Sequence, residues 1–396
     1  MPTGLFRLAA ILGLLSAVGP FAIDMYLPAL PTVAEDLDSS IASAQLTLTW
    51  YFIAFGAAQL IYGPMADQIG RKKPLYLGLA IFMLGSLGCV FAPTMDWLAA
   101  ARFVQGAGAA SLMVVPRAIV RDGYTGTEAT RLMALIMLVI SVSPMLAPLV
   151  GSGLIAVWDW RAIFVALCVA AAFSLLMTAT MLPETLEKQN RVRVNACSLI
   201  SGASILIKDP AFMSLTFIGG FGLASFFVFL ASASFVYTGQ FGLSPVEFSL
   251  AFAVNAVGFF AASQLAPNLG ARFGIIKTIS MASTGFLCCA VLLLALTLVG
   301  FGTLPVIIFL LFLGNGFLGL IFPTTMVLAL EDHGEIAGLA SSLGGTFQMV
   351  TGALMIVVVS PFFDGTATPM IAAITFCAVI AFALTRLVLL RLPQQD

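Results

Sequence analysis

The stretch GPMADQIGRKK, residues 63–73, is a short charged segment between two long apolar runs. The run before it covers residues 43–64 and the run after it covers residues 74–92. Each has the length of roughly 20 residues that a helix needs to cross a bilayer. The stretch ends on three consecutive bases at 71–73. Because Lys and Arg gather in the cytoplasmic loops of membrane proteins, the stretch indicates a cytoplasmic turn between two transmembrane helices.

The same alternation of apolar run and short polar turn fills the chain. Its 396 residues are 61% hydrophobic and 9% charged, with a mean hydropathy of +1.09, whereas a soluble domain carries about 25% charged residues. The runs lack the period-two alternation of membrane barrel strands, so they indicate helices. We therefore predict an all-α membrane protein with twelve transmembrane helices, at 6–30, 43–64, 74–92, 97–120, 130–157, 161–182, 211–237, 246–267, 275–298, 303–330, 336–360 and 369–390.

The basic residues predict the orientation. With both termini in the cytoplasm, all but two of the 17 Lys and Arg residues fall at or near cytoplasmic loops and ends. The exceptions are Arg161, in an outer loop, and Arg102, inside a span. The opposite topology would place most of the bases outside, against the usual bias.

One long polar stretch, residues 183–210, separates six spans from six. Its position predicts two six-helix halves, 1–183 and 209–396, joined by a cytoplasmic linker at 184–208. An internal repeat supports this division, because PNLGARFGIIK at 267–277 aligns with 63–73 at an offset of 204. The alignment matches Gly70 with Gly274 and Lys73 with Lys277.

Residues 63–73 resemble the loop motif of the major facilitator superfamily, G-x-x-x-D-[RK]-x-G-[RK]-[RK]. RFVQGAGAA at 102–110 is similar to a second motif of that family, and SVSPMLAPLVGSG at 141–153 to the antiporter motif of its exporters. IDMYLPALP, VRDGY, WDWRAIF and PETL together look like the bicyclomycin and phenicol exporter branch of drug/proton antiporters. The resemblance implies two pseudo-symmetric halves that alternate in opening to either side.

The loop motif implies a conformational latch between the halves, which holds the outward-facing state and releases on switching. The resemblance assigns it to Gly63, Asp67, Gly70 and Arg71, and Arg71 can pair with Asp122 of VRDGY. We expect Asp67, in an inner loop, to accept from the positive N-terminus of a neighbouring helix. The alternative is a simple positive-inside anchor, which explains the bases and leaves Asp67 unexplained.

Two charged residues lie well inside predicted spans, Asp24 and Arg102. A charge near the bilayer centre costs at least about 2.5–3.5 kcal/mol, so such residues are candidates for function. Asp24 is either a proton site, as the D-M-x-x-P stretch of the resembled exporters implies, or an interfacial residue that bends the helix before Pro28. Arg102 either couples protonation to transport or braces neighbouring spans.

A drug cavity needs few polar groups in an apolar lining. Five polar side chains offer such groups besides Asp24 itself: Tyr26, Tyr51, Gln105, Asn255 and Gln348. Each has an alternative role as a packing hydrogen bond between helices. We expect a second set of residues, Gly106, Gly108, Pro148 and Gly151, to allow close packing and a bend between the fourth and fifth spans, for gating or for packing alone.

The predicted function is proton-coupled export of lipophilic drugs by a monomer in the bacterial inner membrane. Enzyme motifs are absent, His333 is the only histidine, and the net charge of −1 indicates no nucleic-acid partner. We expect no cofactor or metal and take the proton gradient as the energy source. The alternative is an exporter of a sugar or amino-acid metabolite, and a channel or structural subunit is a different class.

Overall fold

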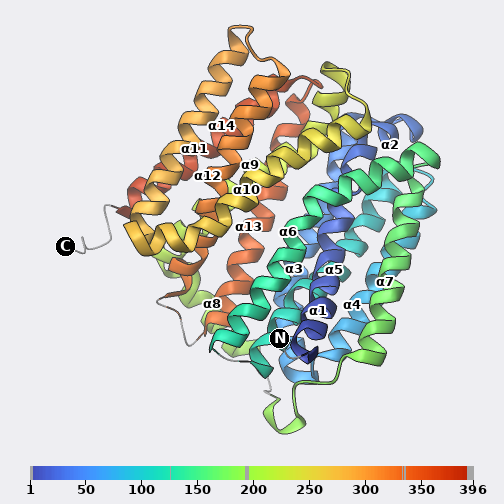
Figure 1. The fold of residues 1–396 in the computed structure, drawn as a ribbon, viewed down its shortest axis with the longest axis vertical. Helices are drawn as coiled ribbons and strands as arrows, with labels where there is room; N and C mark the ends of the chain where they lie inside the picture. Colours follow the sequence, from blue (N-terminus) through green and yellow to red (C-terminus); the bar gives the residue numbers. More distant parts are fainter. Residues whose placement is uncertain (1–2, 125, 192–195, 332, 334–335, 390–396) are drawn as a thin grey trace. The chain divides into compact units, whose positions relative to one another are not determined.

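The computed structural model describes all residues except 1–2, 125, 192–195, 332, 334–335 and 390–396. Every regular element in this part of the chain is a helix (Figure 1), and 12 candidate spans are long and apolar enough to cross a membrane. The prediction of an all-α fold with twelve spans is confirmed. The chain separates into two compact units, residues 1–196 and 197–396.

The first unit holds six candidate spans. Its elements are α1 (Thr3–Asp24), η1 (Leu27–Ala29), α2 (Leu30–Asp36), α3 (Ile41–Ile69), α4 (Lys72–Val90), α5 (Met95–Gly123), α6 (Gly126–Val157), α7 (Arg161–Met181) and the short turn η2 (Lys188–Asn190).

The second unit begins with α8 (Ala196–Lys208), too short to span a membrane. Its other elements are α9 (Pro210–Phe235), the π-helical turn η3 (Val236–Gln240), α10 (Pro245–Phe273), α11 (Ile275–Leu298), α12 (Leu304–Glu331), α13 (Ala337–Val359), η5 (Ser360–Phe362) and α14 (Ala367–Leu389). The predicted linker at 184–208 thus contains η2 and α8.

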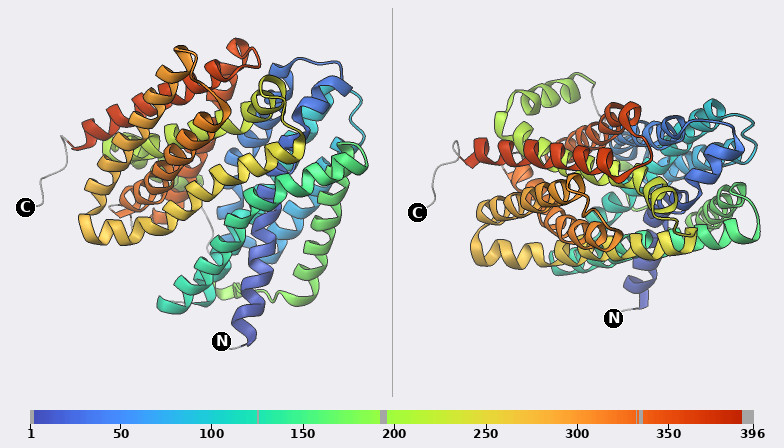
Figure 2. Two further views of the ribbon diagram at one scale, coloured as in Figure 1. Left: turned by 45° about the horizontal axis from the view of Figure 1, so that its top comes forward. Right: turned by 90° about the horizontal axis from the view of Figure 1, so that it is seen from above.

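The two units repeat one packing pattern. In the first, α5 packs on α3 and α4, while α1 packs on α5, α6 and α7. In the second, α12 packs on α10 and α11, while α9 packs on α12, α13 and α14, and the helices of each unit run side by side (Figures 1 and 2). The internal repeat seen at residues 63–73 and 267–277 therefore extends to the packing of the helices.

The first span is broken, where a single run over 6–30 was predicted. α1 ends at Asp24, and the backbone then passes through η1 before α2 continues to Asp36. Pro28 and Pro31 have no N–H, so the carbonyls of Asp24 and Leu27 lose the helical bonds that these residues would have donated. The break leaves the Asp24 side chain at the end of a helix, deep in the first unit.

The second span is longer than predicted. α3 continues through Pro64 to Ile69, so Asp67 lies in a helix and the prediction that it lies in a loop is wrong. The helix ends at Gly70, whose φ of 94° favours glycine, and α10 ends in the same way at Gly274 with φ 85°. These two glycines are the pair aligned by the sequence repeat.

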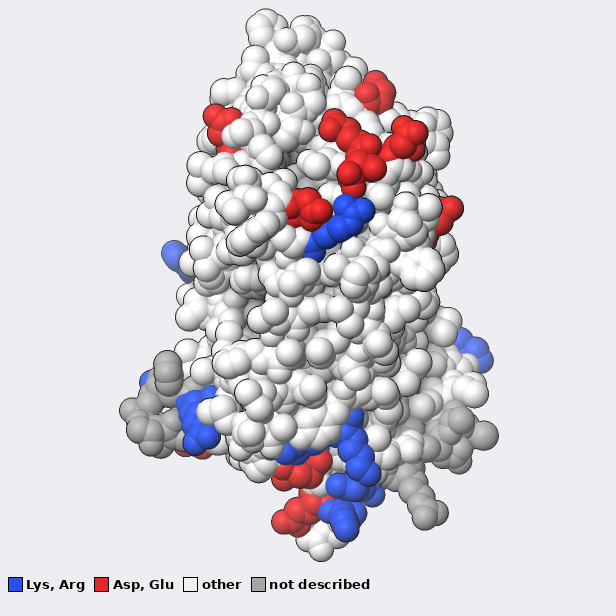
Figure 3. Space-filling view, turned by 90° about the vertical axis from the view of Figure 1, so that its right-hand side faces the viewer, with Lys and Arg blue, Asp and Glu red and all other residues white. Residues whose placement is uncertain are grey.

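The charged side chains on one face fall into two groups. On the face in Figure 3, acidic and basic side chains gather toward the two ends, and a wide band between them carries almost none. Large apolar side chains such as Leu84 and Phe173 are exposed on the helices, 65% and 57% respectively. Lipid is a suitable solvent for such a surface, because exposing apolar side chains there carries no hydrophobic penalty.

Candidate functional site

Arg102 lies in an aromatic cage at the centre of the first unit. The residue is fully buried, and its guanidinium carbon is 4.4 Å from the ring centroid of Tyr51 and 4.9 Å from that of Tyr26. The ring of Phe164, on α7, is 5.9 Å away. Since aromatic faces attract cations, the three rings partly replace the water that Arg102 lacks. We call Arg102, Tyr26, Tyr51 and Phe164 the Arg102 cage.

One nitrogen of the Arg102 guanidinium, Nη1, makes both of its hydrogen bonds. Its Nη1 donates to the carbonyl of Ala22 at 3.0 Å and to Oε1 of Gln105. Gln105 Nε2 donates in turn to Ser86 Oγ at 2.8 Å. Within the described residues, Nε and Nη2 of Arg102 have no acceptor. Arg102 therefore connects α5 to α1, and through Gln105 to α4, while two of its donor atoms remain available.

Asp24 lies near this cage without pairing to it. The residue is buried, and Ser143 of α6 donates to its Oδ2 at 3.2 Å. Among the described residues no ion pair joins Asp24 to Arg102, although the carbonyl that Arg102 binds belongs to Ala22, two residues earlier. The two candidate coupling residues thus lie in one region, and the part of the chain that the structure describes offers the Asp24 carboxyl no counter-ion.

The two tyrosines of the cage are held by their hydroxyls. Thr47 donates to the Ala44 carbonyl at 2.6 Å, so the Tyr26 hydroxyl donates to Thr47 Oγ1 across 3.1 Å. The Tyr51 hydroxyl donates to the Gly19 carbonyl of α1 at 3.0 Å. Both phenols are satisfied inside the protein, so their faces, and not their hydroxyls, are directed to Arg102.

The glycines predicted to allow a bend between α5 and α6 lie instead where these two helices contact other parts of the first unit. A Cβ on Gly106 would collide with the Tyr51 carbonyl of α3, and one on Gly108 would collide with the backbone of α4. A Cβ on Gly151 would collide with the Met25 carbonyl. The expectation of close packing holds, but these contacts join α5 to α3 and α4, and α6 to the break after α1. Pro148 lies inside α6, and its carbonyl accepts from Ser152 at 2.8 Å.

Arg71 is the centre of a second charged group, the Arg71 cluster, formed with Asp67, Asp122 and Glu184. Its guanidinium binds Asp122 through Nε at 2.6 Å and Nη2 at 2.9 Å, and Asp67 through Nη1 at 2.6 Å. Burial alone would lower the pKa of Arg71, but the hydrogen bonds that Arg71 donates to Asp122 and Asp67, with the negative charge of both, outweigh it and raise that pKa above its ordinary value. The two-point contact with Asp122 is the fixed fork geometry that lysine lacks.

Glu184 completes the Arg71 cluster, and the sequence did not assign it a role. Its carboxylate accepts from the backbone N–H of Arg71 at 2.8 Å and of Lys72 at 3.2 Å. These are free N–H groups at the start of α4, where a negative charge also complements the helix dipole. We expected Asp67 at a helix N-terminus, but Glu184 occupies that position and Asp67 accepts from Arg71. A Cβ added at Gly63 would have no described atom within 4 Å.

The remaining predicted lining residues, Asn255 and Gln348, lie in the second unit. Asn255 of α10 is fully buried, donates to the Ala251 carbonyl at 3.1 Å, and accepts from Asn315 of α12 at 3.5 Å. Gln348 of α13 is also buried, packed where a Cβ on Gly219 of α9 would meet it at 2.7 Å. Both side chains join helices of their own unit.

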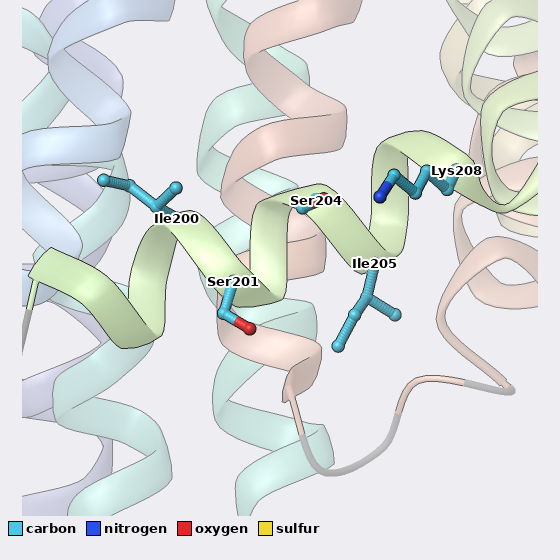
Figure 4. A pocket seen from close by; sticks show the side chains of 5 residues that line it. All are labelled: Ile200, Ser201, Ser204, Ile205 and Lys208. Atoms are coloured by element: carbon cyan, nitrogen blue, oxygen red, sulfur yellow. The ribbon is translucent and has the colours of Figure 1, made fainter.

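A surface hollow on α8 has a different character. It is lined by Ile200, Ser201, Ser204, Ile205 and Lys208, all from this one helix (Figure 4). Since Ile200 and Ile205 are 70% and 56% exposed, the hollow is an open surface feature and does not enclose a ligand. Among the described residues no group of three or more His, Cys, Asp or Glu side chains is arranged to hold a metal ion.

Comparison with known sequences identifies relatives over nearly the whole chain. Residues 12–356 match the family model of the Major Facilitator Superfamily. An uncharacterized MFS-type transporter, YdgK of Bacillus subtilis, is 34% identical, with 97% of each chain covered. A bicyclomycin resistance protein homolog of Haemophilus influenzae is 30% identical, with 93% of each covered. Multidrug resistance protein D of Escherichia coli is 32% identical, covering 87% of this chain and 86% of that one.

Comparison with solved structures supports the same fold. The crystal structure of the nucleoside transporter NupG superposes with a TM-score of 0.75, covering 98% of this chain and 99% of the other at 14% identity. At that identity the likeness concerns the fold alone. The matched family and structures are transporters, so the prediction that the chain is not an enzyme is confirmed.

Proposed function

The chain belongs to the Major Facilitator Superfamily, and we propose on that premise that it is a proton-coupled exporter of lipophilic drugs. The names of two relatives, a bicyclomycin resistance protein homolog and a multidrug resistance protein, support drug export. The composition supports lipophilic substrates over sugars, because the spans are almost uncharged and sugars need many hydrogen-bonding groups.

One observation carries the proposal of proton coupling: a buried carboxyl, Asp24, has a single hydroxyl partner and no counter-ion among the described residues. Removing a carboxylate from water disfavours its charged form, so such a group readily exchanges a proton when its surroundings change. The permanent charge of Arg102 lies in the same region and favours ionisation of Asp24 whenever the two approach.

In the proposed cycle, a drug enters from the cytoplasm and displaces the proton from Asp24. The two halves then expose the site to the other side of the membrane, where protonation of Asp24 promotes drug release. The proton and the drug are linked because each changes the affinity for the other through one site. No cofactor is required, since the proton gradient supplies the free energy.

We place the protein in the bacterial inner membrane as a monomer, with both termini in the cytoplasm. The basis for this orientation is the distribution of Lys and Arg, including Arg71 and Lys72 at the start of α4. The loss of the Arg71–Asp67 contact during the cycle is the proposed latch release.

The test is drug-induced proton release from purified protein, with wild type and Asp24→Asn measured side by side. Asn keeps the size of the side chain but cannot titrate, so the variant should release no protons and should lose concentrative drug transport in proteoliposomes. Exchange of drug for drug should continue, which also separates a transporter from a channel. Asp159→Asn makes the same substitution at an exposed carboxylate and should behave as wild type. Equal proton release from wild type and Asp24→Asn would remove Asp24 from the coupling mechanism.

A further inference from the structure

Asp36, the last residue of α2, is held by two residues at the start of α7. The indole Nε1 of Trp160 donates to Asp36 Oδ2 at 2.9 Å, and Arg161 Nη1 reaches the same oxygen at 3.0 Å. Trp160 is 1% exposed and its ring lies 4.2 Å from the Arg161 guanidinium carbon. A second contact, from Arg161 Nη2 to the Ala92 carbonyl at 3.4 Å, joins the end of α4. We call Asp36, Trp160 and Arg161 the Asp36 clamp.

A continuous series of ring contacts leads from the clamp into the first unit. Trp160 packs edge-on against Phe164, with centroids 6.1 Å apart and an interplanar angle of 89°. Phe164 packs against Tyr26 with centroids 5.6 Å apart, and it also faces Arg102. Phe164 and Tyr26 are fully buried. Because close-packed side chains transmit small displacements, a shift of Trp160 is passed to the Arg102 cage.

The backbone makes a second connection between the same two places. Tyr26 immediately precedes η1, and η1 leads directly into α2, whose last residue is Asp36. The segment lacks two helical hydrogen bonds, at Pro28 and Pro31, and the clamp adds contacts at the end of α2 to the packing of α2 on α3. The clamp therefore fixes Tyr26 from two directions, through Phe164 and through the chain itself.

We propose that Asp36, Trp160 and Arg161 are positioning residues that hold the Tyr26 ring over Arg102, so that opening of the clamp loosens the transport site. This role rests on the proposed function, because it concerns the same site. None of the three residues touches Asp24 or Arg102 in the described contacts, so an effect on that site must travel through Phe164 or the α2 segment.

The first experiment needs no substrate. The chain has 6 tyrosines, so 3-fluorotyrosine labelling gives a small ¹⁹F spectrum in which Tyr26→Phe assigns the Tyr26 signal. Asp36→Asn removes the charge of the clamp, and Trp160→Phe keeps a ring against Phe164 while removing the indole donor. Both should shift the Tyr26 signal. Asp159→Asn removes a charge 3.7 Å from Arg161 Nη1 but keeps the side-chain oxygen that accepts from the Arg161 backbone N–H at 2.7 Å, so it should leave the Tyr26 signal unchanged.

The second experiment identifies the route. In a Phe164→Leu background the ring contact is lost, so adding Asp36→Asn should shift the Tyr26 signal less than it does in wild type. Drug affinity should follow the same pattern, with Kd raised about fivefold by Asp36→Asn in wild type and less in the Phe164→Leu background. Thermal melting of each variant confirms that it is folded.

The outcomes separate the clamp from the function. If the Tyr26 signal ignores both Asp36→Asn and Trp160→Phe while wild type exports drugs, the clamp has no positioning role and the proposed function stands. If the signal responds while wild type neither binds nor exports any drug, the proposed function fails and the clamp is retained. If Asp36→Asn shifts the Tyr26 signal and raises the drug Kd equally in wild type and in the Phe164→Leu background, the clamp does not act through the Phe164 ring.

Discussion

At the scale of single residues, Arg102 is a fully buried charge whose burial costs free energy. A charge at this depth costs at least about 2.5–3.5 kcal/mol, and the compensation comes from two acceptors and three aromatic faces. An exposed cation–π contact contributes about 0.5–1 kcal/mol and a desolvated one about 2 or more, so the cage offsets much of the cost. This compensation depends on the planar shape of the guanidinium, because its edge donates hydrogen bonds while its flat faces contact aromatic rings.

We therefore predict that Arg102→Ala lowers concentrative drug export at least about tenfold, because hydrogen bonds to a charged group contribute about 1.5–3 kcal/mol each. Arg102→Lys should recover only part of the activity, since an ammonium group is not planar and cannot both donate these hydrogen bonds and stack on the rings. Arg386→Ala removes an exposed arginine of α14 and is the control. Transport in proteoliposomes measures all three. Wild-type export by the alanine variant would exclude Arg102 from coupling.

At the scale of helices, the number of spans was predictable, and so were both ends of α11, whereas the break in the first span and the end of α3 were not. Long apolar runs determine span count, because a bilayer leaves the backbone few alternatives. The sequence predicts that the second span ends at Pro64, yet α3 continues through it, since transmembrane helices tolerate proline. Asp24 and Arg102 were recognisable because charges inside apolar runs are rare. Their partners were not, because Ser143 lies 119 residues from Asp24 and Glu184 lies 113 from Arg71.

The contact between α5 and α3 gives a prediction for helix packing. Gly106→Ala places a Cβ against the Tyr51 carbonyl, so the helices must separate, at a cost of about 1–3 kcal/mol. The melting temperature should fall, and drug affinity should fall with it because Tyr51 is displaced from Arg102. Gly63→Ala is the matched control, since nothing lies within 4 Å of its added Cβ. Alanine is the better helix former, so this variant should melt at or slightly above the wild-type temperature. Similar melting of both variants would contradict the packing argument.

At the scale of the whole molecule, the proposed latch would make transport depend on the contact between Arg71 and Asp67. Asp67→Asn removes one carboxylate from Arg71 but leaves the two-point bond to Asp122, so the fold should persist. We predict about a fivefold loss of export rate with drug Kd within about twofold of wild type, because only the balance between the two states changes. Binding in detergent and export in proteoliposomes measure the two effects. A large loss of affinity in a folded variant would place Asp67 in the binding site instead.

The paired turns at Gly70 and Gly274 show what the two copies share and where they have diverged. Both glycines end a helix with the same unusual backbone angle, yet the positions that match Asp67 and Arg71 at the offset of 204 are Ala271 and Ile275. If the halves descend from one duplicated ancestor, backbone geometry was retained in both copies, whereas the charges are present in only one. The two units therefore share a fold, while the proposed latch belongs to the first alone, so an acid at position 271 and a base at position 275 should add a second latch and slow export.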